Sequence, residues 1–303
     1  MRKRYWQLWL LVLIVFILAG CGHQTIPDFD GNKAFIYLKQ QCDFGPRVPN
    51  SKAAHDCEDY LYDKLAATTD VCRRQKFTYH DEDTGDTLYL TNIIASYNPD
   101  NSQRVLLCAH WDSRPWVDEE PDSSLHHLPV PGANDGASGV AVLLVIAETL
   151  KKYRPSIGVD IIFFDGEDYG DFGKPDKWLL GSKYFVKNIG GYHPLYVILL
   201  DMIGDADLQI YKEYYSQKYA DWLVKRIWRA AELEEASHFY PYVKHAVLDD
   251  HRPFQEVGIS AAVIIDMDYK YWHKLSDTPD KCSVESLNEV GRVVLRLLYD
   301  KNL

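Results

Sequence analysis

The sequence predicts a three-layer α/β/α sandwich around a central, mostly parallel mixed sheet. Short apolar segments such as RVLLCAH (104–110), VDIIFF (159–164) and AAVIID (261–266) have the pattern of strands buried on both faces. Between them lie segments in which apolar residues recur every three or four positions, which is helical spacing. Such strands alternating with helices are typical of a parallel sheet covered on both sides. No linker divides residues 32–303, so we expect a single folded domain there.

The first half of the chain is expected to form two helices followed by three strands. Helical spacing of apolar residues covers 33–42 and 51–67. The strands are expected at 71–80, 87–98 and 104–110, where residues alternate between apolar and polar or form apolar runs. Turns rich in Asp, Gly, Asn and Pro separate these three strands.

The second half alternates helices and strands. The expected helices are 137–153, a short one at 178–188, the amphipathic segment 216–234 and the C-terminal segment 284–300. The expected strands are 159–164, 194–204 and 261–266. This alternation places both helical layers around one sheet.

The N-terminus has the pattern of a bacterial export signal rather than of a folded segment. A basic start is followed by a long apolar run and by Leu-Ala-Gly-Cys at 18–21. That tetrapeptide resembles a lipobox, and the resemblance implies cleavage before Cys21 and lipidation of its thiol. We expect a signal peptide over 1–20, a lipidated Cys21 with a linker over 21–31, and one folded domain over 32–303. The expected location is the cell envelope, facing the periplasm on the inner or outer membrane; the alternative is an uncleaved membrane anchor.

The charge balance limits the classes of partner. Thirty-three basic and 44 acidic residues give a formal net charge of −11. Nucleic-acid binding needs clustered Lys and Arg to contact phosphates, so a nucleic-acid partner is not expected. Contact with a membrane is expected only through the lipid anchor.

Cysteine usage argues against a thiolate metal site. No CxxC motif occurs. Cys108 lies in the apolar run 104–110, and we expect it to be a free buried thiol. An oxidising compartment permits disulfides among the remaining cysteines, whose pairing stays open.

Ionisable residues follow the carboxyl ends of several expected strands. His110 and Asp112 follow the run 104–110. Glu167 and Asp168 follow the strand 159–164, and Asp201 ends the run LYVILLD. Ligands of such sheets bind beyond the carboxyl ends of the strands, so these side chains are expected at one cleft. Asp112 is expected to orient a neighbouring group.

Three loops add further candidates. Asp135 lies in PGANDGASG (131–139), Asp249 in LDDHRPF (248–254), and His273 in YWHKLSDT (271–278). Carboxylates that converge in one cleft repel one another unless a cation lies among them. Oxygen and imidazole ligands without thiolate suit an open catalytic Zn²⁺ site with three protein ligands. No GxSxG elbow or Walker loop offers another chemistry.

The same segments carry a family resemblance. AHWDS, PGANDGASG, DGED, LLDMIGD, DDHRPF and WHKLSDT occur in the order seen in the zinc aminopeptidase and glutaminyl cyclase superfamily. The resemblance runs from about residue 44 to the last helix. It implies a zinc-exopeptidase-like fold, with Asp135, Asp168 and His273 as zinc ligands and Glu167 as general acid/base.

Two branches of this superfamily remain open. The aminopeptidases bind two metals, with the positions of His110 and Asp201 as additional ligands. The glutaminyl cyclases typically hold one zinc, and Asp201 joins a hydrogen-bond network. The sequence DDHRPF, the motif AHWDSRP and Trp272 before His273 resemble the cyclase branch. Asp168 departs from the Glu of many members, and PGANDGASG resembles both branches.

The cyclase interpretation implies that an N-terminal glutamine of a peptide or exported protein becomes pyroglutamate with release of ammonia. Zinc would polarise the γ-amide carbonyl. Glu167 would carry a proton from the α-amine to the leaving nitrogen. Asp249 and Asp201 would hydrogen-bond nitrogen groups. Trp272 would line the substrate pocket. The alternatives are a two-metal exo-aminopeptidase and a non-enzymatic binding lipoprotein.

The candidate acids also have structural interpretations. Asp135 could cap the helix 137–153. Glu167 and Asp168 could form a solvated turn, and Asp201 could be a structural acid. Their joint occurrence with the other motifs favours the functional interpretation.

The candidate rings have structural interpretations too. His273 could be a surface histidine. His110 could be a ligand, a support for a ligand or a structural residue, so we leave it out of the metal set. Trp111, Trp116 and Trp178 either line the pocket or pack in the core.

Overall fold

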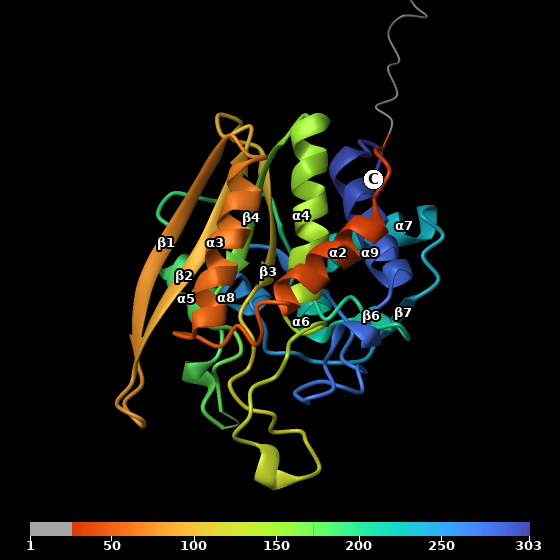
Figure 1. Ribbon diagram of the computed structural model, residues 1–303. Helices are drawn as coiled ribbons and strands as arrows, with labels where there is room; N and C mark the ends of the chain where they lie inside the picture. The colour runs from red at the N-terminus through yellow and green to blue at the C-terminus, as the bar shows by residue number, and fades with distance from the viewer. Residues whose placement is uncertain (1–25, 172) are drawn as a thin grey trace, which may run out of the picture.

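The computed structural model describes residues 26–171 and 173–303, which form a six-stranded mixed sheet between two layers of helices (Figure 1). The strand order is β1-β2-β4-β3-β5-β8. The strands are β1 (Val71–His80), β2 (Thr87–Tyr97), β3 (Arg104–His110), β4 (Gly158–Phe164), β5 (Val197–Asp201) and β8 (Ala261–Ile265). The pairs β4-β3, β3-β5 and β5-β8 are parallel, whereas β1 and β2 are antiparallel additions at one edge. The predicted α/β/α sandwich with a mostly parallel sheet is confirmed.

Two helical layers cover the sheet. One face packs against α2 (Gly31–Cys42), α3 (Lys52–Ala66), α4 (Ala137–Lys152), α7 (Asp221–Leu233) and α9 (Val284–Tyr299). The other face packs against α5 (Leu180–Lys187) and α8 (His251–Glu256). Both faces of the central strands are therefore buried, which explains their continuous apolar sequences.

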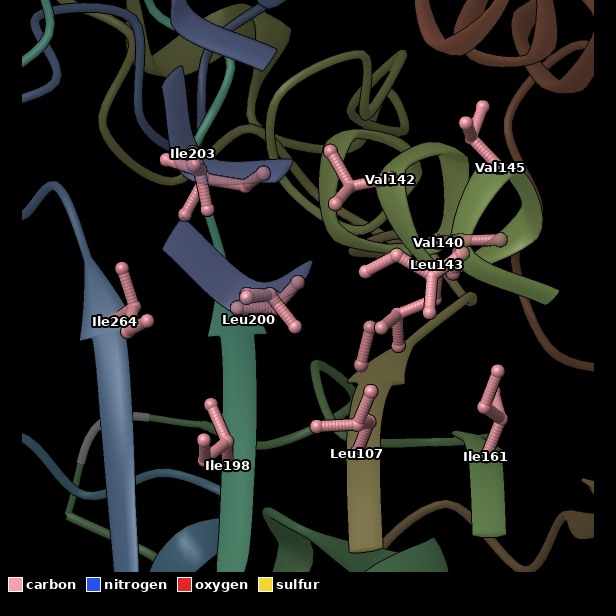
Figure 2. Packing of buried hydrophobic residues seen from close by; sticks show 14 of the residues in the cluster. Leu107, Val140, Val142, Leu143, Val145, Ile161, Ile198, Leu200, Ile203 and Ile264 are labelled. Atoms are coloured by element: carbon pink, nitrogen blue, oxygen red, sulfur yellow. The ribbon is translucent and has the colours of Figure 1, made fainter. Parts of the chain in front are cut away.

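Successive residues of each central strand point to opposite layers. Figure 2 shows Leu107 of β3 and Ile161 of β4 beneath Val140 and Leu143 of α4, with Ile198 on the neighbouring β5, and all five belong to one hydrophobic cluster. The residues between them belong to the other hydrophobic cluster, on the α5 and α8 side. The sheet is thus fixed from both sides, which makes its carboxyl edge a rigid platform for side chains.

The second half of the chain differs from the prediction at two elements. The expected helix 216–234 is divided into α6 (Tyr214–Tyr219) and α7, because Ala220 leaves the helical region with φ −141° and ψ 43°. Ser216 Oγ of α6 accepts a hydrogen bond from Val263 N of β8, which fixes α6 to the sheet. The expected strand 194–204 is shorter, because Met202 has a φ of 46° directly after β5.

A small parallel sheet of β6 (Ile210–Lys212) and β7 (Phe239–Val243) was not predicted. Its strands are three and five residues long, too short for a clear sequence pattern.

The start of the folded domain also differs. The predicted signal peptide 1–20, Cys21 and the first part of the linker lie outside the described residues. The expected linker reached residue 31, but Phe29 is already buried in the main core. The side chain of Asp30 accepts a hydrogen bond from Lys33 N and caps α2, which begins at Gly31. Among residues 26–171 and 173–303, no helix is both long and apolar enough to cross a membrane.

The five cysteines in the described part of the chain are free, and Cys108 is buried, as predicted.

Candidate active site and metal centre

The candidate side chains meet at the carboxyl edge of the parallel strands. His110 ends β3, Asp201 ends β5, and Glu167 and Asp168 follow β4. Asp135 precedes α4, Asp249 precedes α8, and His273 follows β8. All seven side chains are buried. Loops that are far apart in the sequence therefore converge on one cluster of acids and imidazoles.

Two overlapping groups could hold a metal ion. In the first, Asp135, Asp168 and His273 each offer one ligand atom, and these atoms lie within 4.8 Å of one another. The distance from His273 Nε2 to Asp168 Oδ1 is 3.4 Å. In the second, His110 Nε2 lies 3.1 Å from Asp135 Oδ1 and 3.2 Å from Asp201 Oδ1. Asp135 is shared by both groups.

The first group contains the three residues that the resemblance assigns to zinc. His110, which we left out of the metal set, belongs to the second group together with Asp201. Its place at the carboxyl end of a central strand was the sequence signal for this position. The structure therefore brings together ligand sets for either one or two ions.

Unpaired buried oxygens indicate that the first group fits a cation. Asp135 Oδ2 and Asp168 Oδ2 are buried and have no hydrogen-bond partner. Such an atom costs about 1–3 kcal/mol unless something binds it. The lone pairs of two carboxylates and one imidazole match the donor set that Zn²⁺ prefers in open sites.

The pKa values of the buried acids are shifted in two directions. Burial and the charge of Asp168 raise the pKa of Asp135 to about 7. Burial also acts on Asp168, but the charges of His273 and Arg114 outweigh it and hold the pKa of Asp168 below its ordinary value. Burial raises the pKa of Glu167 well above its ordinary value, an effect that His110 opposes and nearby carboxylates strengthen. A carboxyl group with a raised pKa is suited to donate as well as accept a proton.

Two further buried acids hold the ligand loops in place. Asp112 accepts hydrogen bonds from the backbone N–H groups of Glu167 (3.2 Å) and Asp168 (3.1 Å). Its Oδ1 also lies 3.4 Å from Nδ1 of His110. Asp277 accepts from the backbone N–H of Asp135 at 3.2 Å. The sequence pattern indicated Asp112 as an orienting group but did not indicate Asp277.

The loop around Asp135 depends on a buried arginine and a glycine. Arg47 donates hydrogen bonds to the carbonyl oxygens of Trp111, Pro131 and Gly132. Gly136 has a φ of 96°, and a Cβ at this position would lie 2.5 Å from the carbonyl oxygen of Asp112. Gly136 is the residue at the N-cap of α4, which has no side-chain cap, so the capping role considered for Asp135 is not observed.

Aromatic rings flank His273. The ring centroid of Trp272 lies 3.8 Å from that of His273, and Trp178 stacks on it at 6.2 Å. Trp111 is buried and donates its indole N–H to Thr91 O, so it packs in the core. Trp272 and Trp178 are therefore the indoles beside the metal ligands.

The remaining residues of DDHRPF form a separate buried network. Ser182 donates its hydroxyl to Asp250, and His251 Nε2 lies 3.3 Å from Glu213 Oε2. The backbone N–H of Asp250 donates to Asp249 Oδ1 at 2.6 Å, which fixes one oxygen of that carboxylate. Asp249 Oδ2 is buried without a partner.

Comparison with known proteins identifies the family. A model of peptidase family M28 matches residues 92–298, more than half of the chain. The chain belongs to peptidase family M28. The zinc implied by M28 exopeptidases and cyclases agrees with the oxygen and imidazole donors at the centre.

Similar M28 structures include both activities. A Bacteroides thetaiotaomicron glutaminyl cyclase bound to N-acetylhistamine is 38% identical, with 92% of this chain and 100% of that chain covered and a TM-score of 0.88. A leucine aminopeptidase precursor from the same organism is 38% identical, with 92% and 99% covered and a TM-score of 0.89. This M28 chain is thus an enzyme of the glutaminyl cyclase or zinc exopeptidase kind.

One similar protein has the name of a cyclotransferase. Glutaminyl-peptide cyclotransferase of Bos taurus is 26% identical over 250 residues, covering 69% of this chain. The chain matches 66% of the length of the bovine protein, slightly less than two thirds.

Proposed function

We propose that this M28 enzyme is a zinc-dependent glutaminyl-peptide cyclotransferase that converts an N-terminal glutamine into pyroglutamate and ammonia. The observation that carries the proposal is the group of buried acids beside the first metal group. Glu167 lies close enough to Asp249 for the charge of that carboxylate to raise its pKa. The unpaired Asp249 Oδ2 is an acceptor suited to an N–H group of the substrate.

Asp135, Asp168 and His273 would hold the zinc ion, which when bound supplies a Lewis acid that polarises the γ-amide carbonyl. Glu167 accepts a proton from the α-amine as the amine nitrogen bonds to the carbonyl carbon (Cδ) of the side-chain amide. Glu167 then delivers that proton to the amide nitrogen as its bond to carbon breaks, and ammonia leaves. Asp249 and Asp201 accept hydrogen bonds from these nitrogens.

The position in which the substrate is held also accelerates the reaction. The attacking amine belongs to the same glutamine as the amide, so the protein needs only to hold a folded conformer of that residue. The exposed part of Trp272, whose ring lies beside that of His273, offers an apolar wall for the glutamine methylenes. Substrates would be peptides or exported proteins with N-terminal glutamine.

The proposal includes the domain plan and location inferred from the N-terminus. Residues 1–20 would be a signal peptide, Cys21 the lipidated residue, and the folded part a single catalytic domain in the cell envelope. The basic start and the Leu-Ala-Gly-Cys sequence support this proposal.

The second metal group favours one alternative function, a two-metal exo-aminopeptidase. His110 and Asp201 lie within hydrogen-bond distance of one another and would be ligands of a second ion. The aminopeptidase would release the first residue of a peptide through an activated water rather than through the substrate's own amine.

One experiment separates these functions. The zinc-loaded protein is offered a Gln-initiated peptide and a Leu-initiated peptide of otherwise identical sequence, and ammonia and free amino acid are measured. The cyclase proposal expects ammonia from the first peptide and no free leucine from the second. Free leucine without ammonia would establish the aminopeptidase, and neither product would indicate a binding protein.

A further inference from the structure

The backbone of His273 has an unfavourable conformation. Its φ is 55°, in the left-handed region that residues other than glycine rarely adopt. Such a conformation persists only where surrounding contacts hold it. One contact comes from Glu120, whose Oε1 accepts a hydrogen bond from Leu275 N at 2.9 Å. The segment that follows β3 thus braces the segment that carries His273.

Asp118, two residues before Glu120, contacts the imidazole itself. Its Oδ1 lies 3.0 Å from Nδ1 of His273. A carboxylate only accepts hydrogen bonds, so Nδ1 of His273 is the protonated nitrogen in this contact. The other nitrogen, Nε2, faces Asp168 Oδ1 at 3.4 Å and is the ligand atom of the first metal group. Asp118 therefore favours the tautomer in which the lone pair of His273 Nε2 can bind a metal.

Arg114 connects the carboxylate of Asp118 to Asp168, another member of the first metal group. Arg114 donates to both oxygens of Asp118, at 2.9 and 2.5 Å. Its other terminal nitrogen donates to Asp168 Oδ1 at 3.2 Å and to the carbonyl oxygens of Asp168 (3.1 Å) and Gly170 (2.9 Å). The guanidinium is completely buried. It fixes the backbone from which the short Asp168 side chain extends.

We propose that Asp118, together with Arg114, is a positioning residue that sets the zinc affinity of the site. The carboxylate of Asp118 orients the ring of His273. The guanidinium of Arg114, which pairs with Asp118, holds Asp168 at a fixed place relative to that ring. Two of the three ligands are thereby joined before the metal binds. This inference rests on the zinc site of the proposed function, but it does not depend on which reaction the site performs.

The test compares two substitutions at neighbouring positions. Asp118→Asn keeps the shape of the side chain but removes the charge that pairs with Arg114. Glu119→Gln makes the same change of charge one residue later, where the side chain is exposed and forms no hydrogen bond with the described residues. The zinc dissociation constant of each purified protein is measured by competition with a chelator, without substrate. Thermal unfolding of the metal-free forms reports whether each variant is folded.

Asp118→Asn is expected to weaken zinc binding by about 10–100-fold, the usual cost of losing a partner of a ligand. Glu119→Gln is expected to bind zinc as the parent protein does. With Co²⁺ in place of zinc, only the Asp118 variant should show a changed visible spectrum. Unchanged zinc affinity in a folded Asp118→Asn protein would overturn the proposal.

A measurement on the unmodified protein covers the case in which Asp118→Asn does not fold. Nitrogen-15 NMR of the zinc-loaded protein reports the tautomer of His273, and protonation at Nδ1 is expected. Protonation at Nε2 would overturn the proposal. Failure of the cyclase proposal is a different result, the absence of ammonia from a Gln-initiated peptide, and it leaves the zinc affinities as they are.

Discussion

Asp135 Oδ1 lies 3.1 Å from Nε2 of the buried His110. The other oxygen of Asp135 is 3.9 Å from Nε2 of His273, so this carboxylate stands between two imidazoles. One carboxylate between two histidines can serve a single zinc with a supporting hydrogen bond, or it can bridge two ions. The functions of His110 and Asp201 follow from which of these occurs.

The first prediction concerns Asp201. In the one-zinc cyclase Asp201 is not a ligand, so Asp201→Asn should keep one zinc per chain while lowering the rate of ammonia release by about 10²–10³-fold. Elemental analysis and a coupled ammonia assay on the same preparation measure both quantities. A parent protein with two zinc ions, one of which is lost in Asp201→Asn, would support the aminopeptidase instead.

The second prediction concerns proton transfer by Glu167. Glu167→Gln retains the shape of the side chain but cannot accept the proton of the α-amine. Turnover should fall by about 10²–10⁴-fold while the zinc content stays unchanged. Steady-state kinetics with a Gln-initiated peptide provides the measurement. Unaltered turnover would reject the assignment of Glu167 as general acid/base.

The third prediction concerns the apolar wall. Trp272→Ala removes a ring whose burial by substrate contributes about 1.5–3 kcal/mol, so kcat/KM should fall about 10–100-fold. Trp272→Phe should recover most of that loss, because a smaller ring still offers an apolar face. The zinc content of both variants serves as the control, since the indole contacts the ring of His273. A Trp272→Ala protein with normal zinc content and normal kcat/KM would contradict the assignment.

The fourth prediction concerns pH and a buried ion pair that holds the loop before Trp178. Lys177 Nζ donates to both oxygens of the buried Asp81 at 2.7 Å. Burial opposes ionisation of Asp81, but Lys177 and other donors outweigh it and lower the pKa of Asp81 to about 2. A folded-state pKa below the unfolded value of about 3.9 gives stability that is present above that pH and lost as pH falls toward 2.

Lys177→Gln should therefore lower the free energy of unfolding at pH 7, by about 3–5 kcal/mol if Asp81 stays charged and buried. The difference from the parent protein should shrink below about pH 4 and approach zero only as the pH falls through 2, where Asp81 is half ionised. Urea unfolding at pH 7, 4 and 2.5 measures it. A difference that is constant with pH would show that the pair does not act through its charge.

The fifth prediction concerns Cys21. When the whole chain is expressed in a bacterium that processes lipoproteins, the parent protein should appear in the membrane fraction with a lipid mass on Cys21. Cys21→Ser should remove that mass. Mass spectrometry of the N-terminal peptide is the readout, and an unmodified Cys21 in the parent protein would exclude the lipid anchor.

The sequence was sufficient to predict the central layers and the edge of the sheet at which the candidate site residues lie. Buried parallel strands have continuous apolar sequences, and their carboxyl ends share one edge, so His110, Glu167 and Asp201 could be placed together from the strand pattern alone. The pairing of Asp135 with Asp168 and His273 came from the motif resemblance, and the structure brings these three side chains into one group.

The contacts that hold the site could not be predicted in the same way. Asp118 is separated from His273 by 155 positions, and Asp277 from Asp135 by 142. The acidic segment 118–120 has the composition of an exposed loop, and nothing in its local sequence indicates a partner near His273. The break at Ala220 was missed for a similar reason, because apolar spacing continues across it while a contact with β8 fixes α6.

The most direct test of the central claim is a crystal grown with zinc, with diffraction data collected at the zinc absorption edge. The account predicts one anomalous peak bound by Asp135, Asp168 and His273, with Asp118 on the far side of the imidazole. A peak elsewhere, or these three side chains turned away from a common point in the presence of zinc, would contradict it.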